Sequence, residues 1–335
     1  YDQQITNATT TATSSQADSA LSSGVETNNT VPPNASWAVA WQEIMWLCRD
    51  ASNPHYLWYS KRFRPESVPA ANFLEIGNPD DPLQCAVPLV GLLGVFSRLT
   101  KYRVTGNASS GFVHDEALSH RGSPGAPFTV VPTDQGLVFL ARDGVFRTNL
   151  IGAAVELSAA IGQMFFGETV NDMSPVNWSA IATASAATYK GRVYLALPTG
   201  TNTTPDMLAG WSWLTRRWYF YDHPCRTLLV EEDVDDLVAG FTDGFVYILE
   251  DGTTDAGSDM TLTVETKAYF GQTIDTRKLF LWLRVDAESQ GDSLSVALIV
   301  DGTVKRTASV TTSRGRALIP FPEGSLGYTW WAIVT

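Results

Sequence analysis

The chain has 335 residues, of which 35 are acidic and 23 are basic, so its formal net charge is −12. Hydrophobic residues make up 44 % of it, and 11 Trp, 11 Tyr and 15 Phe supply enough buriable surface to exclude a wholly disordered chain. The acidic balance argues against binding to nucleic acid or to an anionic membrane surface, because both depend on clustered Lys and Arg.

The cysteines and the apolar runs give no indication of a disulfide-rich or a membrane-spanning protein. Cys48, Cys85 and Cys225 form no CxxC pair and are expected to be small buried residues. The longest apolar run, residues 85–96, is far shorter than the roughly 20 residues that a spanning helix needs. We therefore expect no membrane-spanning segment.

Residues 1–36 differ in composition from everything that follows. They are rich in Thr, Ser and Asn, contain no Trp or Phe, and include the Pro32-Pro33 pair. Such a segment cannot bury enough surface to fold alone, so it is expected to be an extended arm or linker that gains order against a partner.

Residues 37–258 consist of short alternating runs separated by turn signals. Apolar and polar residues alternate in 136–141, 192–197 and 245–249, as in half-buried strands. An Asp-Gly pair between apolar runs favours a type I′ hairpin, because both central residues of that turn have positive φ. Four such pairs are expected to be structural turns: Asp143-Gly144, Asp243-Gly244, Asp251-Gly252 and Asp301-Gly302.

A repeat gives the strongest indication of architecture. The segment LVFLARDGVFR at 137–147 resembles LVAGFTDGFVY at 237–247. Taking Ile44, Leu92, Leu137, Arg192 and Leu237 as equivalent points gives steps of 48, 45, 55 and 45 residues. This spacing predicts an all-β protein of the β-propeller type with about five to six blades, each a small antiparallel sheet. A generic antiparallel sandwich is the alternative.

Two further elements complete the expected organisation. Residues 153–166 fit one short amphipathic helix. Residues 259–335 alternate again, with a hairpin at residues 294–309, and predict an additional small β-sandwich-like domain. The expected domains are thus an arm at 1–36, a propeller at 37–258 and a β-domain at 259–335.

No motif for catalysis, metal or cofactor binding is visible. The four histidines have no HxH or HExxH spacing, and GxSxG and phosphate-binding loops are absent. A glycosidase needs two carboxylates across a cleft, for which Asp115, Glu116, Asp143 and Asp243 are candidates. Turn chemistry alone explains the last two. We therefore expect neither a catalytic residue nor a metal ion nor a cofactor.

Two further segments, one acidic and one aromatic, could bind a ligand. The acidic run Glu231, Glu232, Asp233, Asp235 and Asp236 lacks the spacing of a Ca²⁺ loop and is expected to be a solvated loop between strands. The aromatic and basic residues of 211–221 suit either a stacking platform for bases or sugars, or two strands with alternate aromatic side chains buried.

The order of these motifs resembles that of a known family. Residues 86–106, the Gly122 to Pro127 turn, the strand and turn at 136–146, and Leu157-Ser158 with Ile161 follow one another as in tail β-propeller proteins of short-tailed bacteriophages. The later strands at 189–197, 213–221 and 239–249 and the segment at 266–286 are similar to those that close the family pattern. The resemblance spans about residues 40–300 and omits the arm.

This resemblance implies a tail nozzle, also called a packaged-DNA stabilisation protein. Members form a hexameric ring that continues the DNA channel from the head-to-tail adaptor and retains and then conducts the genome. The implied partners are copies of the same chain, adaptor or connector proteins, tail fibre or tip proteins, and double-stranded DNA that passes without specific binding. The implied location is the virion, after assembly in the host cytoplasm, and no enzymatic activity is implied.

An acidic chain suits such a role, because an acidic lumen repels phosphate and lets a duplex slide. The run at 231–236 is accordingly a candidate for a channel-facing loop. The alternative function is a carbohydrate-binding or glycosidase-type propeller, which a pocket with paired carboxylates would favour.

Overall fold

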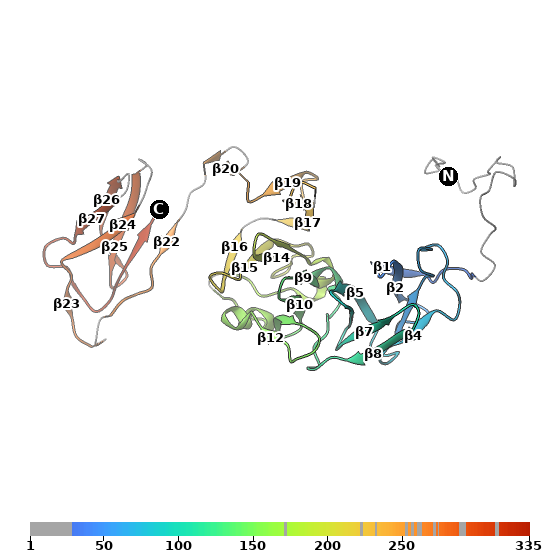
Figure 1. The fold of residues 1–335 in the computed structure, drawn as a ribbon. Coiled ribbons are helices and arrows are strands. Elements are labelled where there is room, and N and C mark those ends of the chain that lie inside the picture. The colour runs from blue at the N-terminus through green and yellow to red at the C-terminus, as the bar shows by residue number, and fades with distance from the viewer. Residues whose placement is uncertain are drawn as a thin grey trace. The chain divides into compact units, whose positions relative to one another are not determined.

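The computed structural model describes residues 29–335 except 171–172, 222–223, 232, 252–253, 256–257, 260–262, 271–272, 274, 288–292 and 312–314. The chain divides into two compact units, Tyr1–Glu250 and Asp251–Thr335. Both are built almost wholly of antiparallel strands (Figure 1). The fold is therefore all-β. No helix among the described residues has the length and apolar character that crossing a bilayer requires.

The first unit is a series of five antiparallel sheets, which we call blades 1 to 5. Blades 1 to 4 have four strands each and blade 5 has three, and strands that are consecutive in the chain are neighbours in each sheet. Blade 1 contains β1 (Ala35–Trp41), β2 (Ile44–Asp50), β3 (Tyr56–Tyr59) and β4 (Phe73–Glu75); blade 2 contains β5 (Leu83–Leu89), β6 (Leu92–Ser97), β7 (Lys101–Asn107) and β8 (Gly111–Glu116); blade 3 contains β9 (Val131–Thr133), β10 (Gly136–Ala141), β11 (Gly144–Thr148) and β12 (Val155–Glu156); blade 4 contains β13 (Ser185–Tyr189), β14 (Arg192–Leu197), β15 (Met207–Ser212) and β16 (Arg217–Tyr221); blade 5 contains β17 (Cys225–Glu231), β18 (Asp236–Phe241) and β19 (Val246–Leu249).

The sequence repeat coincides with these blades. Ile44, Leu92 and Arg192 begin the second strand of their blades, and Leu137 and Leu237 lie one residue inside theirs. The first strand of each blade contacts the first strand of the next, from β1 through β5, β9 and β13 to β17. This is the arrangement of propeller blades, so the predicted architecture is confirmed.

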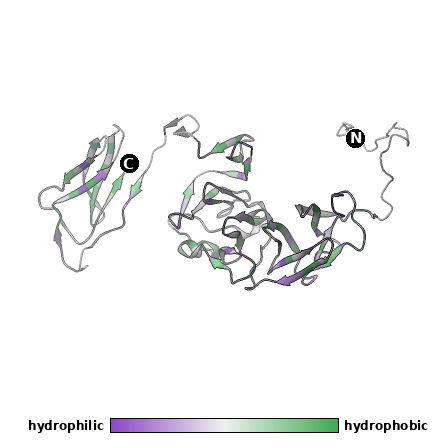
Figure 2. Ribbon diagram, viewed as in Figure 1, coloured by the Kyte–Doolittle hydropathy of each residue, from purple (hydrophilic) through white to green (hydrophobic). Residues whose placement is uncertain are grey.

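Blades stack because their second strands have two apolar faces. In β6, Leu93 and Val95 join a core shared with blade 1, whereas Phe96 joins a core shared with blade 3. Figure 2 shows hydrophobic residues concentrated along the strands of these sheets. Strands that are buried on both faces consist mainly of apolar residues, which accounts for the low charge content of the chain.

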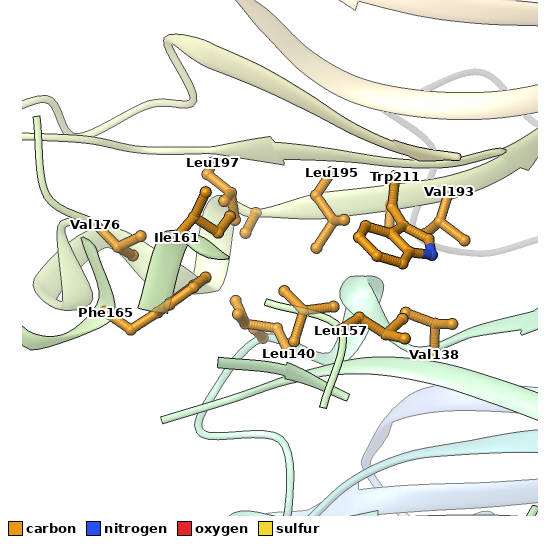
Figure 3. Packing of buried hydrophobic residues seen from close by; sticks show 14 of the residues in the cluster. Val138, Leu140, Leu157, Ile161, Phe165, Val176, Val193, Leu195, Leu197 and Trp211 are labelled. Atoms are coloured by element: carbon orange, nitrogen blue, oxygen red, sulfur yellow. The ribbon is translucent and has the colours of Figure 1, made fainter. Parts of the chain in front are cut away.

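The core between blades 3 and 4 illustrates the packing. Val138 and Leu140 of β10 face Val193 and Leu195 of β14, with Trp211 of β15 beside them (Figure 3). Each of these side chains is less than a tenth exposed. Burying one such aliphatic side chain contributes about 1.5–3 kcal/mol, so each interblade junction holds its two sheets together.

The amphipathic α-helix expected at 153–166 is replaced by other structure. Val155 and Glu156 form the edge strand β12, and only η3 (Ala159–Phe166) is helical, in the 3₁₀ form. Ile161 and Phe165 of η3 pack in the core between blades 3 and 4. Pairing of β12 with β11 removes the first turns that a full α-helix would need. Two more 3₁₀ segments are η2 (Pro127–Thr129) and η4 (Trp178–Thr183).

The hairpin turns differ in part from expectation. Of the described Asp-Gly pairs, only Asp301-Gly302 has positive φ at both residues, as a type I′ turn requires. Asp143 lies in a two-residue loop and Gly144 pairs with Ala141, while Asp243 and Gly244 belong to a longer loop. Asp251 follows β19, and Gly252 lies outside the described residues. Two-residue loops at Gln42-Glu43 and Lys190-Gly191 have the type I′ signs without Asp-Gly.

Only the end of the expected arm lies within the described residues. Asn29 Oδ1 accepts a hydrogen bond from the Val68 amide at 2.8 Å, and Thr30 Oγ1 donates one to the Val68 carbonyl at 3.0 Å. This stretch therefore lies against the loop between β3 and β4. Residues 1–28, and with them most of the expected arm, lie outside the described residues.

The second unit has its own core. Val296 and Leu298 of the central strand β25 pack with Ile319 and Phe321, and the β25–β26 hairpin is the one that the sequence predicts. A four-stranded sheet β22-β29-β25-β26 is accompanied by the pairs β24-β27, β23-β28 and β20-β21. The strands are β20 (Thr254–Asp255), β21 (Ser258–Asp259), β22 (Val264–Glu265), β23 (Lys278–Leu279), β24 (Trp282–Ala287), β25 (Ser293–Val300), β26 (Thr303–Thr311), β27 (Gly315–Pro320), β28 (Leu326–Gly327) and β29 (Trp330–Val334).

Candidate functional site

One apolar face of blade 5 has no neighbouring blade among the described residues. Leu228, Leu237 and Ala239 face the core shared with blade 4. On the other face Leu229, Val238 and Ile248 form a row of paired residues across β17, β18 and β19. Leu229 is 63 % exposed and Ile248 is 52 % exposed. We call this surface, together with Val246, the blade 5 outer face.

Blade 1 has a corresponding surface at the other end of the series. Ala38, Leu47, Trp58 and Phe73 are paired across β1 to β4 on the side opposite the core shared with blade 2. Ala38 is exposed and the other three are half-buried. We call this row the blade 1 outer face. Among the described residues, no hydrophobic cluster joins blade 1 to blade 5.

Charged residues lie in the turns and loops beside both outer faces. The acidic run occupies the turn between β17 and β18, where Glu231 and Asp236 are directly paired and Asp233 and Asp235 are exposed. Glu232 lies outside the described residues. Two like charges in direct cross-strand contact are destabilising unless a cation approaches.

A basic loop lies beside the corresponding turn of blade 1. Lys61, Arg62 and Arg64 follow β3, and the Phe63 amide donates to the carbonyl of Glu43 in the β1–β2 turn at 2.8 Å. Arg62 forms an ion pair with Glu43, and Arg64 forms one with Glu66.

Within the chain, turns of this type already meet across a blade junction. Lys190 lies in the β13–β14 turn, and its pKa is raised by its hydrogen bond with Tyr189 and further by attraction from Asp235 and Asp236 in the β17–β18 turn. Adjacent blades therefore bring their first turns close enough for opposite charges to interact.

A second feature is a basic pocket between blades 2 and 3. It has a volume of about 380 Å³ and is lined by Arg98, His120, Arg121, Arg142 and Asp143 among others. Three separate segments supply these side chains: the β6–β7 turn, the connection from β8 to β9, and the β10–β11 turn. Three arginines against one carboxylate contrast with the net charge of −12 for the chain.

The carboxylates considered for glycosidase chemistry are engaged elsewhere. Asp115 forms an ion pair with Arg103 at 3.3 Å, and a Glu116 carboxylate oxygen lies 2.9 Å from His120 Nδ1. Asp143 holds Arg121 at 2.9 Å. Asp243 Oδ1 accepts from the Phe245 amide and its Oδ2 from the Tyr247 hydroxyl, as a turn residue does. Of the four, only Asp143 lines the pocket between blades 2 and 3.

The aromatic segment 211–221 is a pair of strands rather than a stacking platform. Trp211 is buried, and Trp213, Trp218 and Phe220 pack on the core between blades 3 and 4. Trp218 Nε1 donates to the Leu157 carbonyl at 2.9 Å, which fixes the ring beside η3. The interpretation as blade strands with alternate aromatic side chains buried is thus confirmed.

The three cysteines are buried and unpaired, as expected. Burial raises the pKa of Cys48 to about 12 and that of Cys225 to about 11, so neither thiol is a nucleophile at neutral pH. Burial likewise raises the pKa of Cys85 well above its ordinary value. Within the described ranges, no group of His, Cys, Asp and Glu is arranged to hold a metal ion.

Comparisons with known proteins give no assignment. No family model and no curated protein matches the chain. Among solved structures it is similar to the extracellular domain of a one-component system from B. thetaiotaomicron, with a TM-score of 0.40 and 10 % identity over 90 % of this chain and 41 % of that one. The chain thus spans less than half the length of that protein.

Two further solved structures cover both chains more fully. An exo-β-1,3-galactanase from Phanerochaete chrysosporium has a TM-score of 0.36 at 10 % identity, covering 91 % of this chain and 93 % of its own. Virginiamycin B lyase from Staphylococcus aureus has a TM-score of 0.39 at 10 % identity, covering 89 % of this chain and 94 % of its own. Likeness at this level carries no functional argument, and none of the three is a tail protein.

Proposed function

We propose that this chain is a structural, non-enzymatic subunit that assembles with copies of itself by docking the blade 5 outer face of one copy on the blade 1 outer face of the next. The observation that carries the proposal is the pair of apolar rows at the two ends of the blade series, neither of which packs against a further blade among the described residues. Every blade between them buries both faces against neighbours.

The proposed junction repeats the packing that the chain uses internally. The row of Leu229, Val238 and Ile248 would meet Leu47, Trp58 and Phe73 as Val138 and Leu140 meet Val193 and Leu195 in blades 3 and 4. The acidic β17–β18 turn would then lie beside the basic loop of the next copy. Apolar burial supplies affinity, and the complementary charges set the register.

This contact is heterologous, because two different surfaces meet. Such contacts build closed rings when the rotation between copies closes, and filaments when it does not. On the resemblance to tail propellers, we propose the ring to be the hexameric nozzle of a short-tailed phage, located in the virion and bound to adaptor and fibre proteins. A channel requires more than one chain, so the channel-facing position of 231–236 stays a prediction.

The oligomeric state of the full chain tests the docking. We expect sedimentation velocity at micromolar concentration to show a discrete oligomer, and Leu229→Arg to weaken association by about tenfold or more, because a buried cation would be unpaired among apolar residues. Leu214→Arg is the matched control: Leu214 is 94 % exposed in the β15–β16 turn, away from both outer faces.

Two results would overturn the docking. One is a monomer in which both outer faces are protected from hydrogen exchange, which would show that blades 1 and 5 of the same chain join. The other is an oligomer that Leu229→Arg and Leu214→Arg affect equally. The finer assignment has its own test, because a nozzle should be present in purified virus particles at about one copy per two portal chains.

A carbohydrate-binding propeller is the second candidate, and the pocket between blades 2 and 3 is the observation that favours it. The pocket offers cationic side chains with aromatic rings close behind two of them. A glycosidase of the usual type needs two carboxylates across the bond that breaks, and Asp143 alone among the candidates lines this pocket. Binding without hydrolysis is therefore the form of this function that the residues suit.

A further inference from the structure

We propose that the pocket between blades 2 and 3 is a binding site for a compact oxyanion of the phosphate or sulfate type, held by Arg98, Arg121 and Arg142. The inference is independent of the docking proposed above. It rests on how three separate segments bring these side chains to one cavity, and on the contacts that hold two of them there.

Two of the arginines are already held in place. Arg121 Nε donates to Asp143 Oδ2 at 2.9 Å, and its guanidinium lies 4.5 Å from the centre of the Phe146 ring. The Arg142 guanidinium lies 4.5 Å from the centre of the Trp178 ring. A planar guanidinium fixed on an aromatic face keeps its N–H edge free for a bidentate oxyanion and loses less entropy on binding.

The turn that presents Arg98 is equally well fixed. Asp81 Oδ1 accepts a hydrogen bond from the Leu99 amide at 2.9 Å, and Asp81 Oδ2 accepts one from Ser97 Oγ at 2.6 Å. Among the described residues, the structure gives the Arg98 guanidinium no ion-pair partner, although it lines the pocket. The Arg98 guanidinium is therefore available to contact a bound anion.

The connection that carries Arg121 is pressed against this same turn. A Cβ on Gly122 would lie 2.3 Å from the Ser97 carbonyl oxygen, so only glycine allows this approach. The same connection is also held by Lys101, whose Nζ donates to the carbonyls of Leu118 and Ser119 at 3.0 and 2.6 Å. Burial, and then repulsion from Arg121, lowers the pKa of Lys101 to about 8.

The size and charge of the cavity define the ligand class. A volume of about 380 Å³ admits a pyrophosphate group or one sulfated sugar unit, whereas the phosphates of a rigid duplex lie on a convex surface and cannot all enter a concave pocket. Among the described residues of the lining, Asp143 is the only carboxylate, and Arg121 neutralises it. The pocket therefore keeps an excess of positive charge.

Calorimetric titration of the full chain at constant ionic strength tests the site. The probes are inorganic pyrophosphate and a heparin-derived sulfated disaccharide, with a short DNA duplex as a third arm. We expect pyrophosphate to bind, and the double variant Arg98→Ala/Arg142→Ala to weaken binding by at least about tenfold, because two charge-assisted contacts are lost. Tighter binding of the disaccharide would identify a sugar-borne anion, and tighter binding of pyrophosphate a free one.

Matched controls guard against general charge effects and misfolding. Arg226→Ala removes one exposed cation of β17 outside the pocket and should leave the affinity within about twofold. Arg98→Gln keeps most of the side chain and should weaken binding while the melting temperature is unchanged. The proposal is overturned if the native chain does not bind either anion up to about 10 mM. An equal loss with Arg226→Ala, or duplex binding that the double variant leaves intact, would also overturn it.

Discussion

Blades 3 and 5 carry the same eleven-residue pattern, yet they bury it very differently. In blade 3, Leu137 to Ala141 are all fully buried and Phe146 is 2 % exposed. In blade 5, only Leu237 and Ala239 of the corresponding strand are fully buried. Val246 matches Phe146 in the sequence repeat, but the longer β18–β19 loop pairs it with Gly240 on the outer face, where it is 69 % exposed. Among the described residues, blade 3 packs against a blade on both sides and blade 5 against one.

The difference shows that burial in a blade array is set by position in the series as much as by sequence. Both blades place leucine at the first matched position, on the face toward the preceding blade. On the opposite face, β10 packs on blade 4, whereas no other described blade covers Val238 and Gly240 of β18. The docking proposed above would cover this face.

The largest expected effect comes from Phe146, whose ring packs on Phe139 and under Arg121. Phe146→Ala should lower the free energy of unfolding by about 3–5 kcal/mol, because it removes a fully buried ring and leaves a cavity. Val246→Ala, at the position matched in the sequence repeat but on the blade 5 outer face, should cost less than about 0.5 kcal/mol in the isolated chain. Urea denaturation of both variants measures this difference, and equal losses would contradict the assigned burial.

Val138 and Val238 offer a smaller but cleaner comparison, because the same residue type occupies equivalent positions. Val138 is fully buried between blades 3 and 4, whereas Val238 lies half-buried on the blade 5 outer face. Val138→Ala should cost about 2 kcal/mol, and Val238→Ala about 1 kcal/mol or less in the monomer. In an assembled protein the two values should converge, so measuring both above and below the association concentration also tests the docking.

The smallest effect concerns the Asp-Gly turns and distinguishes the two units. Backbone hydrogen bonds from Thr329 and Tyr328 hold the pKa of Asp301 below its ordinary value of 3.8. A lowered folded pKa gives stability that is complete above the unfolded pKa and is lost as pH falls through the folded one. Arg284 and Arg316 similarly lower the pKa of Asp286.

The second unit should therefore unfold more readily as pH falls below about 4. Asp301→Asn should lower its stability at neutral pH and remove part of this pH dependence. Cleavage by pepsin between β25 and β26 on heating provides the readout, since pepsin is active across that range. An unchanged pH profile in Asp301→Asn would show that the turn carboxylate contributes nothing.

The parts that sequence reasoning predicted are those set by local pattern. The five repeat points lie at the start of β2, β6, β10, β14 and β18, because strand period and turn spacing are written in consecutive residues. The prediction of a helix at 153–166 was wrong, because pairing of Val155 and Glu156 with β11 outweighed the helical periodicity of the sequence. The predicted turn type at Asp143-Gly144 was wrong, because Gly144 belongs to β11 and pairs with Ala141 of β10.

The basic pocket had no sequence signal at all. Arg98, Arg121 and Arg142 belong to three segments of two blades, and each alone is an ordinary turn or loop residue. The buried Lys101 that fixes one of these segments is also missed, because a lysine at the start of a strand is normally a solvated residue. Only the stacking of blade 2 on blade 3 brings these groups together.

By itself, the sequence determined that the chain is all-β, where its repeating units begin, and which residues of each strand alternate between faces. The tertiary structure alone decided which of those faces are covered, which charges meet across blades, and which cavity gathers three arginines. The physical reason is that alternation and turn chemistry act between neighbours in the chain, whereas burial and electrostatic potential depend on which sheet lies opposite.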